Sequence, residues 1–123
     1  MANILIVEDD LEIAESVAEL LTPAGHVTRT ACNGVEGLRM VAERLPDLIL
    51  LDVEMPILDG PGMAEALALQ RSDLPRIPIV IVSAARNIHK IAGWVGTAHY
   101  LKKPFSAEKM IEVVDLALDS RWR

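Results

Sequence analysis

The chain contains 123 residues, of which 51% are hydrophobic, and its formal net charge is -6. This length and apolar content suit one compact domain spanning residues 1–123, and they exclude an intrinsically disordered chain. The negative charge argues against binding to nucleic acid or to an anionic membrane surface, because both attract clustered Lys and Arg. A single cysteine, no secretory signal pattern and no apolar run near the roughly 20 residues of a membrane span predict a soluble, cytoplasmic protein.

The sequence alternates between short apolar runs and longer segments with helical periodicity. The apolar runs are rich in Ile, Val and Leu without strict polar alternation, which is typical of strands buried on both faces of a parallel sheet. Strands are predicted at residues 3–7, 27–31, 48–51, 77–82 and 98–101. The segment after the first strand has an apolar helical stripe made of Leu11, Ala14, Val17, Ala18 and Leu21. The segment after the second strand has another, made of Val35, Leu38, Val41, Ala42 and Leu45.

Three further helices follow the later strands. The third is predicted to begin at Pro61, whose missing N–H does no harm at a first helical position, and to run towards Arg71. The fourth, within residues 86–95, contains Gly93 and a poor apolar stripe, so a short or irregular helix is expected. The last helix is predicted to start after Ser106, its N-cap. Its apolar residues should face the core, and they are Met110, Val113, Val114, Ala117 and Leu118. Five successive βα units predict an α/β fold with a doubly wound parallel sheet and helices on both faces.

Charged and hydroxyl side chains gather at the predicted carboxyl ends of the strands, where ligands bind in sheets of this kind. They are Glu8, Asp9 and Asp10 after the first strand, Asp52 and Glu54 after the third, Ser83 after the fourth, and Lys102 and Lys103 after the fifth. Carboxylates brought together there would repel one another unless a hard cation neutralised them, which predicts Mg²⁺. Asp52 is then the best-placed nucleophile for a phosphoryl group, with Lys103 pairing with the phosphoryl charge and Ser83 donating a hydrogen bond.

Each of these residues also has a structural interpretation. Asp9 followed by Glu12 fits an N-terminal capping box, and Asp59-Gly60 makes a good turn whatever the function. Ser83 can simply end a strand, and Lys102 with Lys103 can be a solvated pair. Asp52 is harder to explain in this way, because a carboxylate directly after a buried apolar strand must lie at the edge of the sheet or be costly to bury.

The order and spacing of these motifs resemble the receiver domain of two-component response regulators over essentially the whole chain. The matching segments are residues 4–10, 47–56, 59–60, 83–84 and 100–105. The resemblance implies a flavodoxin-like fold, a five-stranded parallel sheet of order 2-1-3-4-5 with helices on both faces. It also implies a signalling switch, which catalyses only its own phosphorylation and dephosphorylation.

The resemblance further implies a role for each matching residue. Glu8 and Asp9 would form the acidic pair that holds Mg²⁺, together with Asp52 and the backbone carbonyl of Glu54. Asp52 would be the phosphoacceptor and Lys103 the phosphate-sensing lysine, in a cis peptide bond with Pro104. Ser83 would be the switch hydroxyl and Tyr100 the switch aromatic residue. The phosphoryl donor would be a histidine kinase or a histidine phosphotransfer protein, and the face made by the fourth helix, fifth strand and last helix would bind a protein partner.

Two other functions stay open at this point. The first is a receiver-like scaffold that binds partners without phosphorylation, and the second is a Mg²⁺-dependent phosphatase with Asp52 as nucleophile and Glu54 as acid. The segment between Ser83 and Lys103 is also short for the family, with Gly96-Thr97-Ala98-His99 where Gly-Ala-Asp-Asp is common. A start at Met1 and the lack of a linker favour a stand-alone regulator over one excised from a longer chain.

Overall fold

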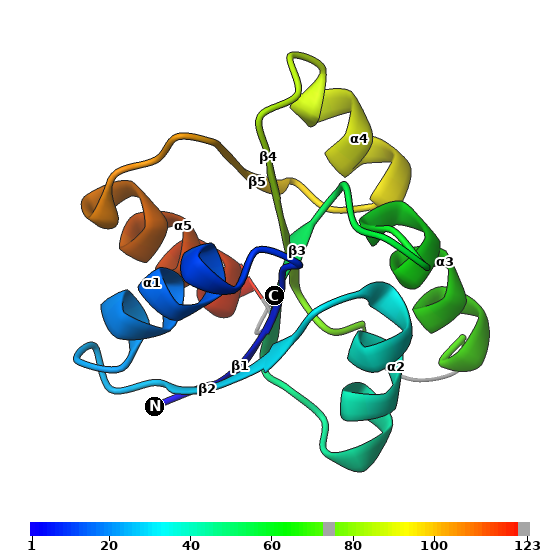
Figure 1. The fold of residues 1–123 in the computed structure, drawn as a ribbon, viewed down its shortest axis with the longest axis horizontal. Helices are drawn as coiled ribbons and strands as arrows, with labels where there is room; N and C mark the ends of the chain where they lie inside the picture. The colour runs from blue at the N-terminus through cyan, green and yellow to red at the C-terminus, as the bar shows by residue number, and fades with distance from the viewer. Residues whose placement is uncertain (73–75, 121–123) are drawn as a thin grey trace.

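The computed structural model describes residues 1–72 and 76–120, apart from the side chain of residue 120, and in this part of the chain strands and helices alternate (Figure 1). The strands are β1 (Asn3–Val7), β2 (Val27–Ala31), β3 (Leu48–Asp52), β4 (Ile79–Ser83) and β5 (His99–Lys102). The helices are α1 (Leu11–Leu21), α2 (Gly34–Glu43), α3 (Gly60–Gln70), α4 (Ile88–Val95) and α5 (Ala107–Ser120). The predicted succession of βα units is confirmed.

The strands form one parallel sheet in the order β2-β1-β3-β4-β5, as expected. In the register of this sheet, Asp52 lies beside Val82, and Ser83 lies beside Lys102. Because all the strands run in the same direction, their carboxyl ends lie along one edge of the sheet. The fold therefore brings together side chains that are far apart in the sequence.

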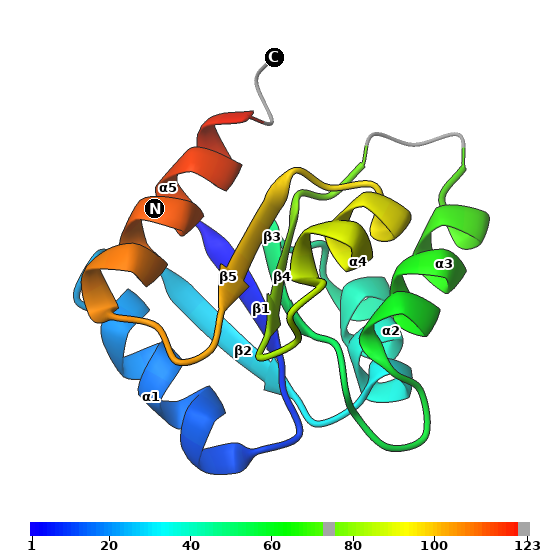
Figure 2. The ribbon, with the colours of Figure 1, turned by 90° about the horizontal axis from the view of Figure 1, so that it is seen from above.

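Helices cover both faces of the sheet. Figure 2 shows α1 and α5 on one side and α2, α3 and α4 on the other. Alternate residues of β1 point to opposite faces of the sheet, and each face has its own hydrophobic core. Ile4 and Ile6 pack in the core under α1 and α5, whereas Leu5 and Val7 pack in the core on the opposite face. This double burial is the reason for the continuous apolar runs in the sequence. Across residues 1–72 and 76–120, no helix has the length and apolarity that crossing a bilayer requires.

The predicted apolar stripes of α1 and α2 are correct for some residues and wrong for others, including the first residue of each stripe. In α1, Ala14, Val17 and Leu21 are buried, but Leu11 is 66% exposed. Val35, in the first turn of α2, is 52% exposed, and Leu45 lies beyond the end of α2. Helical periodicity indicates which side of a helix faces inward, but it does not show where the contact with the sheet ends.

Helix α4 is short, as predicted, but it is regular. It has eight residues, of which Ile88, Ile91 and Ala92 are buried, so the expectation of a poor apolar stripe is wrong. These three residues lie on one side of the helix at spacings of three and four, a pattern that a short segment makes easy to overlook. The helix ends at Gly96, which has a φ of 92° and therefore adopts the left-handed conformation that glycine tolerates best.

Three strands end one residue later than the sequence pattern predicts. Strand β3 includes Asp52, β4 includes Ser83, and β5 includes Lys102. Apolar character stops at the residue before each of these, whereas the hydrogen-bonded pairing continues. The rigid sheet itself thus holds Asp52 and Ser83, both of which are buried.

Candidate functional site

Three carboxylates meet at the carboxyl ends of β1 and β3. One oxygen from each of Glu8, Asp9 and Asp52 lies within 4.8 Å of the others. Glu8 and Asp52 are only 6% and 7% exposed, whereas Asp9 is exposed. The hydrogen bond from the Glu8 N–H to the carbonyl of Ala31 (2.9 Å) extends the β1–β2 pairing and fixes the backbone there. We call these three residues the carboxylate cluster.

Lys103 places its ammonium group against two members of the carboxylate cluster. Its Nζ lies 2.8 Å from Oε1 of Glu8 and 3.3 Å from Oδ1 of Asp52. The Lys103 N–H donates to the carbonyl of Ser83 (2.9 Å), and the peptide bond to Pro104 is cis, as the resemblance implies. The ammonium group of Lys103, which follows β5, is therefore a fixed positive charge within the site.

The environment shifts two pKa values in the site. Burial raises the pKa of Glu8, and the neighbouring Asp52 carboxyl adds to this rise, against the opposing effect of Lys103. Burial alone would lower the pKa of Lys103, but its hydrogen bond to Glu8 and the charges of Asp52 and Glu8 outweigh it, so this pKa is raised. Lys103 is consequently charged at neutral pH, while ionisation of Glu8 is opposed by its surroundings.

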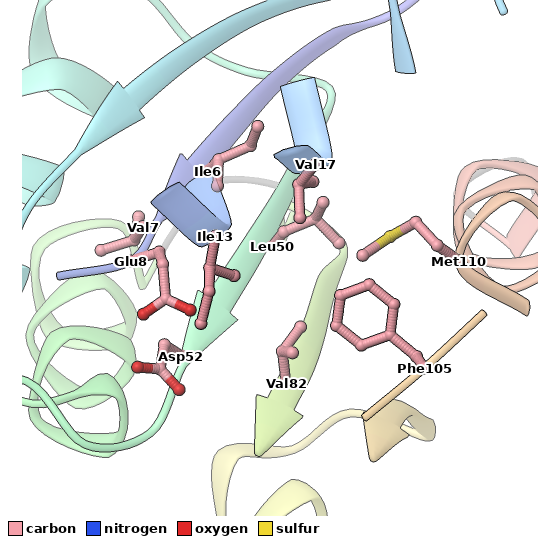
Figure 3. Close-up of a pocket in the computed structure, with 10 residues that line it drawn as sticks. All are labelled: Ile6, Val7, Glu8, Ile13, Val17, Leu50, Asp52, Val82, Phe105 and Met110. Atoms are coloured by element: carbon pink, nitrogen blue, oxygen red, sulfur yellow. The ribbon is translucent and has the colours of Figure 1, made fainter. Parts of the chain in front are cut away.

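An apolar wall lies behind the carboxylate pair. Figure 3 shows Glu8 and Asp52 with their carboxylates side by side, and Phe105 and Met110 in the wall of the adjoining pocket. The pocket is a cavity of about 20 Å³. It is otherwise lined by Ile6, Val7, Ile13, Val17, Leu50 and Val82. Burial of Glu8 beside these apolar side chains is the physical cause of the rise in its pKa.

Asp10, rather than Asp9, is the N-cap of α1. Its Oδ1 accepts hydrogen bonds from the backbone N–H groups of Glu12 (3.0 Å) and Ile13 (3.2 Å). The capping-box interpretation of Asp9 is therefore wrong, because the helix begins one residue later than that motif requires. In the sequence, Asp10 stands directly before Leu11, the first residue of the helix, and this is the position that an N-cap residue occupies. The carboxylate of Asp9 consequently belongs to the cluster.

The loop between β3 and α3 is held close to Asp52 by a turn. Asp59 caps α3 by accepting a hydrogen bond from the N–H of Gly62 (2.8 Å), in keeping with its expected structural role, and α3 begins at Gly60 rather than at Pro61. The N–H of Gly60 donates to the carbonyl of Val53 (2.9 Å). A Cβ atom at Gly60 would collide with the carbonyl oxygen of Asp52. Glycine is required here by close approach of two backbone segments.

The remaining candidate residues lie around the carboxylate cluster in different ways. Ser83 is buried, and its Oγ accepts a hydrogen bond from the N–H of Ala85 (3.0 Å), so its O–H proton can be donated elsewhere. Tyr100 lies within β5 but is 42% exposed. The side chain of Glu54 is exposed and is not a member of the carboxylate cluster.

Comparisons with known proteins agree with this arrangement. A family model described as the response regulator receiver domain matches residues 4–115. The chain belongs to the response regulator receiver domain family. Among solved structures, it resembles the receiver domain of NtrX from Brucella abortus, with 31% identity, a TM-score of 0.84, and coverage of 95% of this chain and 98% of the other. It also resembles the chemotaxis response regulator CheY4 of Vibrio cholerae, with 28% identity, a TM-score of 0.86, and the same two coverages.

The curated relatives of this receiver domain are longer than the chain. The transcriptional regulatory protein PrrA of Mycobacterium tuberculosis is 34% identical over 121 residues, which are 97% of this chain and 51% of PrrA. The response regulator MprA of Mycobacterium avium is 37% identical over 111 residues, which are 89% of this chain and 47% of MprA. The receiver domain thus spans about half the length of these relatives, and a role in phosphorylation-controlled signalling is shared with the family.

Proposed function

We propose that residues 1–123 act as a single cytoplasmic receiver domain in which Asp52 accepts a phosphoryl group from a histidine kinase or a histidine phosphotransfer protein. The observation that carries this proposal is the 3.3 Å separation between Lys103 Nζ and Asp52 Oδ1 in the buried carboxylate cluster. A cation held this close to a nucleophilic oxygen can neutralise charge on an incoming phosphoryl group. In the transfer, the bond between phosphorus and the donor nitrogen breaks, and a bond from phosphorus to an Asp52 carboxylate oxygen forms.

The carboxylate cluster fits Mg²⁺ because it presents hard oxygen donors from three side chains within 4.8 Å of one another. Glu8, Asp9 and Asp52 would hold the ion, with the backbone carbonyl of Glu54 as a further ligand. When bound, Mg²⁺ supplies charge neutralisation at the phosphoryl oxygens. The protein's own part is to place Asp52 on the rigid end of β3, where its side chain is largely buried.

Phosphorylation would change a protein-binding surface. Ser83 would donate a hydrogen bond to the phosphoryl group, and its O–H proton is available for this because its oxygen accepts from Ala85. Tyr100, which is 42% exposed on β5, would move with it. A charge added at Asp52 then shifts the equilibrium between two conformations of the face made by α4, β5 and α5. The output is contact with a downstream protein partner, without direct binding to nucleic acid or membrane.

Intact-mass spectrometry with acetyl phosphate as donor tests the proposal. The wild-type chain should gain the mass of one phosphoryl group only when Mg²⁺ is present, and Asp52→Asn should gain none. Asp115→Asn, at an exposed position of α5, is the matched control and should be labelled like the wild type. Persistent stoichiometric labelling of Asp52→Asn would refute the assignment of the phosphoacceptor, and no labelling of the wild type would favour the constitutive scaffold.

A further inference from the structure

Positive charge is concentrated in one segment of this acidic chain. Residues 74–107 contain five of the twelve Lys and Arg residues and none of the eighteen Asp and Glu residues, although the net charge of the whole chain is -6. This segment supplies β4, α4 and β5. The rest of the chain therefore carries all the carboxylates, and the five cations of this segment lie on or next to β4, α4 and β5.

Two aromatic side chains are exposed in the same region. Trp94 on α4 is 74% exposed, and Tyr100 on β5 is 42% exposed. Lys90 and Trp94 are four residues apart on α4, so they lie on the same side of this helix, opposite the buried residue Ala92. Figure 2 shows α4 alongside β4 and β5. We define the cationic aromatic face as the exposed residues Arg76, Arg86, Lys90, Trp94, Tyr100 and Lys102.

The cations of this face form no ion pair with another residue in the described part of the chain. The ion pairs among residues 1–72 and 76–120 involve Lys103, Arg39 and Lys109 instead. Nη1 of Arg76 donates a hydrogen bond to the carbonyl of Gly96 (3.4 Å), which places its guanidinium at the end of α4. The face therefore offers cations without a partner carboxylate in the described chain, beside the exposed ring of Trp94.

We propose that the cationic aromatic face binds an acidic segment of a partner protein, with an apolar side chain of that segment packed on Trp94. The inference rests on the proposed function, since it gives the chemistry of the partner for the face that phosphorylation is proposed to change. Tryptophan in an exposed position is a frequent anchor of protein interfaces, and the surrounding cations select carboxylates. Nucleic acid and anionic membranes fit less well, because their extended charge would also meet the carboxylates of the rest of the chain.

Selection from a random peptide display library against the immobilised full chain tests this inference. Peptides that combine Asp or Glu with an aromatic or aliphatic residue should be enriched. The most enriched peptide, synthesised with a fluorophore, is then titrated with the wild type, Trp94→Ala and Lys90→Glu. Each variant should bind about tenfold more weakly or worse, and added salt should weaken binding to the wild type. The matched controls are Leu69→Ala on α3, where Leu69 is 75% exposed, and Arg39→Glu on α2, and both should bind like the wild type.

Several results would overturn the inference. These are enrichment of basic or neutral peptides, no enrichment at all, unchanged binding by Trp94→Ala, or tighter binding to duplex DNA or anionic vesicles than to the selected peptides. Self-association in sedimentation experiments that Trp94→Ala abolishes would instead assign the face to a second copy of this chain. Labelling by acetyl phosphate is measured on the same proteins. If Trp94→Ala and Lys90→Glu are labelled normally but bind the peptide more weakly, the loss of binding comes from the face and not from the phosphorylation site. If the wild type binds the peptide but is not labelled, the proposed function is refuted and the inference about the face stands.

Discussion

The Nζ atom of Lys103 lies closer to Glu8, at 2.8 Å, than to Asp52, at 3.3 Å. The lysine therefore compensates two buried carboxylates at once, and Glu8 holds it beside the residue proposed to react. Since Glu8 and Lys103 are 95 positions apart in the sequence, this contact depends on the pairing of β1 with β3, of β3 with β4 and of β4 with β5. The geometry gives Lys103 a structural role as well as a proposed functional one.

Replacing Lys103 by Met should destabilise the metal-free protein. The substitution keeps most of the side-chain volume but leaves Glu8 and Asp52 buried without their cation, which costs about 1–3 kcal/mol in the free energy of unfolding. Urea denaturation in EDTA measures this, and added Mg²⁺ should restore part of the loss. Lys102→Met, at the exposed neighbouring position, is the control and should change stability by less than about 0.5 kcal/mol. Equal stability of the two variants in EDTA would contradict the compensating role of Lys103.

The difference in free energy of unfolding between the wild type and Lys103→Met should depend on pH with a definite sign. The pKa of Lys103 is raised above its ordinary value of 10.5, so the folded state binds the proton more tightly than the unfolded state. The stabilisation is thus fully present below the ordinary pKa and is lost as pH rises through the raised value. The difference between wild type and Lys103→Met should stay constant from neutral to mildly alkaline pH and then shrink. A difference that grows with alkaline pH would show that the ion pair is not its source.

Gly60 and Gly93 should respond in opposite ways to substitution by Ala. A Cβ atom at Gly60 would collide with the carbonyl oxygen of Asp52, and backbone on both sides of the contact has little freedom to move, so we expect a loss of about 1–3 kcal/mol. A Cβ atom at Gly93 meets nothing within 4 Å, and Ala favours the helix, so Gly93→Ala should stabilise by up to about 1 kcal/mol. Thermal denaturation compares the two variants. A Gly60→Ala protein as stable as the wild type would show that the loop after β3 is not packed against Asp52.

The sheet and the place of the site could be predicted from sequence because both follow from buried parallel strands. A run such as residues 48–51 is apolar on both faces, and the polar residue that follows it must lie at the edge of the sheet. The strand ends were less predictable, because Asp52 and Ser83 are polar and yet continue the hydrogen-bonded pairing. Apolar patterning reports burial, whereas pairing depends on the neighbouring strand.

The division of work between adjacent carboxylates could not be predicted from sequence. Asp9 and Asp10 are the same residue type in consecutive positions, and either can cap a helix. Their roles depend on which residue begins the helix, and the structure sets this at Leu11. The unequal distances from Lys103 to Glu8 and Asp52 likewise arise from tertiary packing that no local pattern encodes.

Cys32 should react slowly with alkylating reagents. Its thiol donates a hydrogen bond to Oε2 of Glu36 (3.2 Å), and this bond, with the nearby negative charge, raises the pKa of the thiol. A raised pKa leaves a smaller thiolate fraction at any given pH, and the thiolate is the reactive form. The pH profile of iodoacetamide labelling should shift to lower pH in Glu36→Gln, with faster reaction at neutral pH. Because the chain has one cysteine, total labelling reports this site alone, and identical profiles would exclude control by Glu36.

Substitutions at Asp9 and Asp10 should have separate effects on metal binding and on helix capping. Asp10→Ala removes the N-cap of α1 and should cost about 0.5–2 kcal/mol of stability, while the gain in stability on adding Mg²⁺ stays close to that of the wild type. Asp9→Ala should do the opposite. It relieves repulsion within the carboxylate cluster, so the metal-free protein should be as stable as the wild type or slightly more stable, but the gain from Mg²⁺ should fall sharply.

Chemical denaturation of the wild type and both variants in EDTA and in Mg²⁺ gives the six free energies that this comparison needs. A ligand at one hundred times its dissociation constant stabilises a protein by about 2.7 kcal/mol, so loss of the Mg²⁺ response is measurable. If Asp10→Ala lost the Mg²⁺ response and Asp9→Ala kept it, the assignment of the two carboxylates would be reversed. The observed hydrogen bonds from Glu12 and Ile13 to Asp10 argue against that outcome, because a carboxylate oxygen that caps a helix is already held by two donors and is a poorer ligand for a cation.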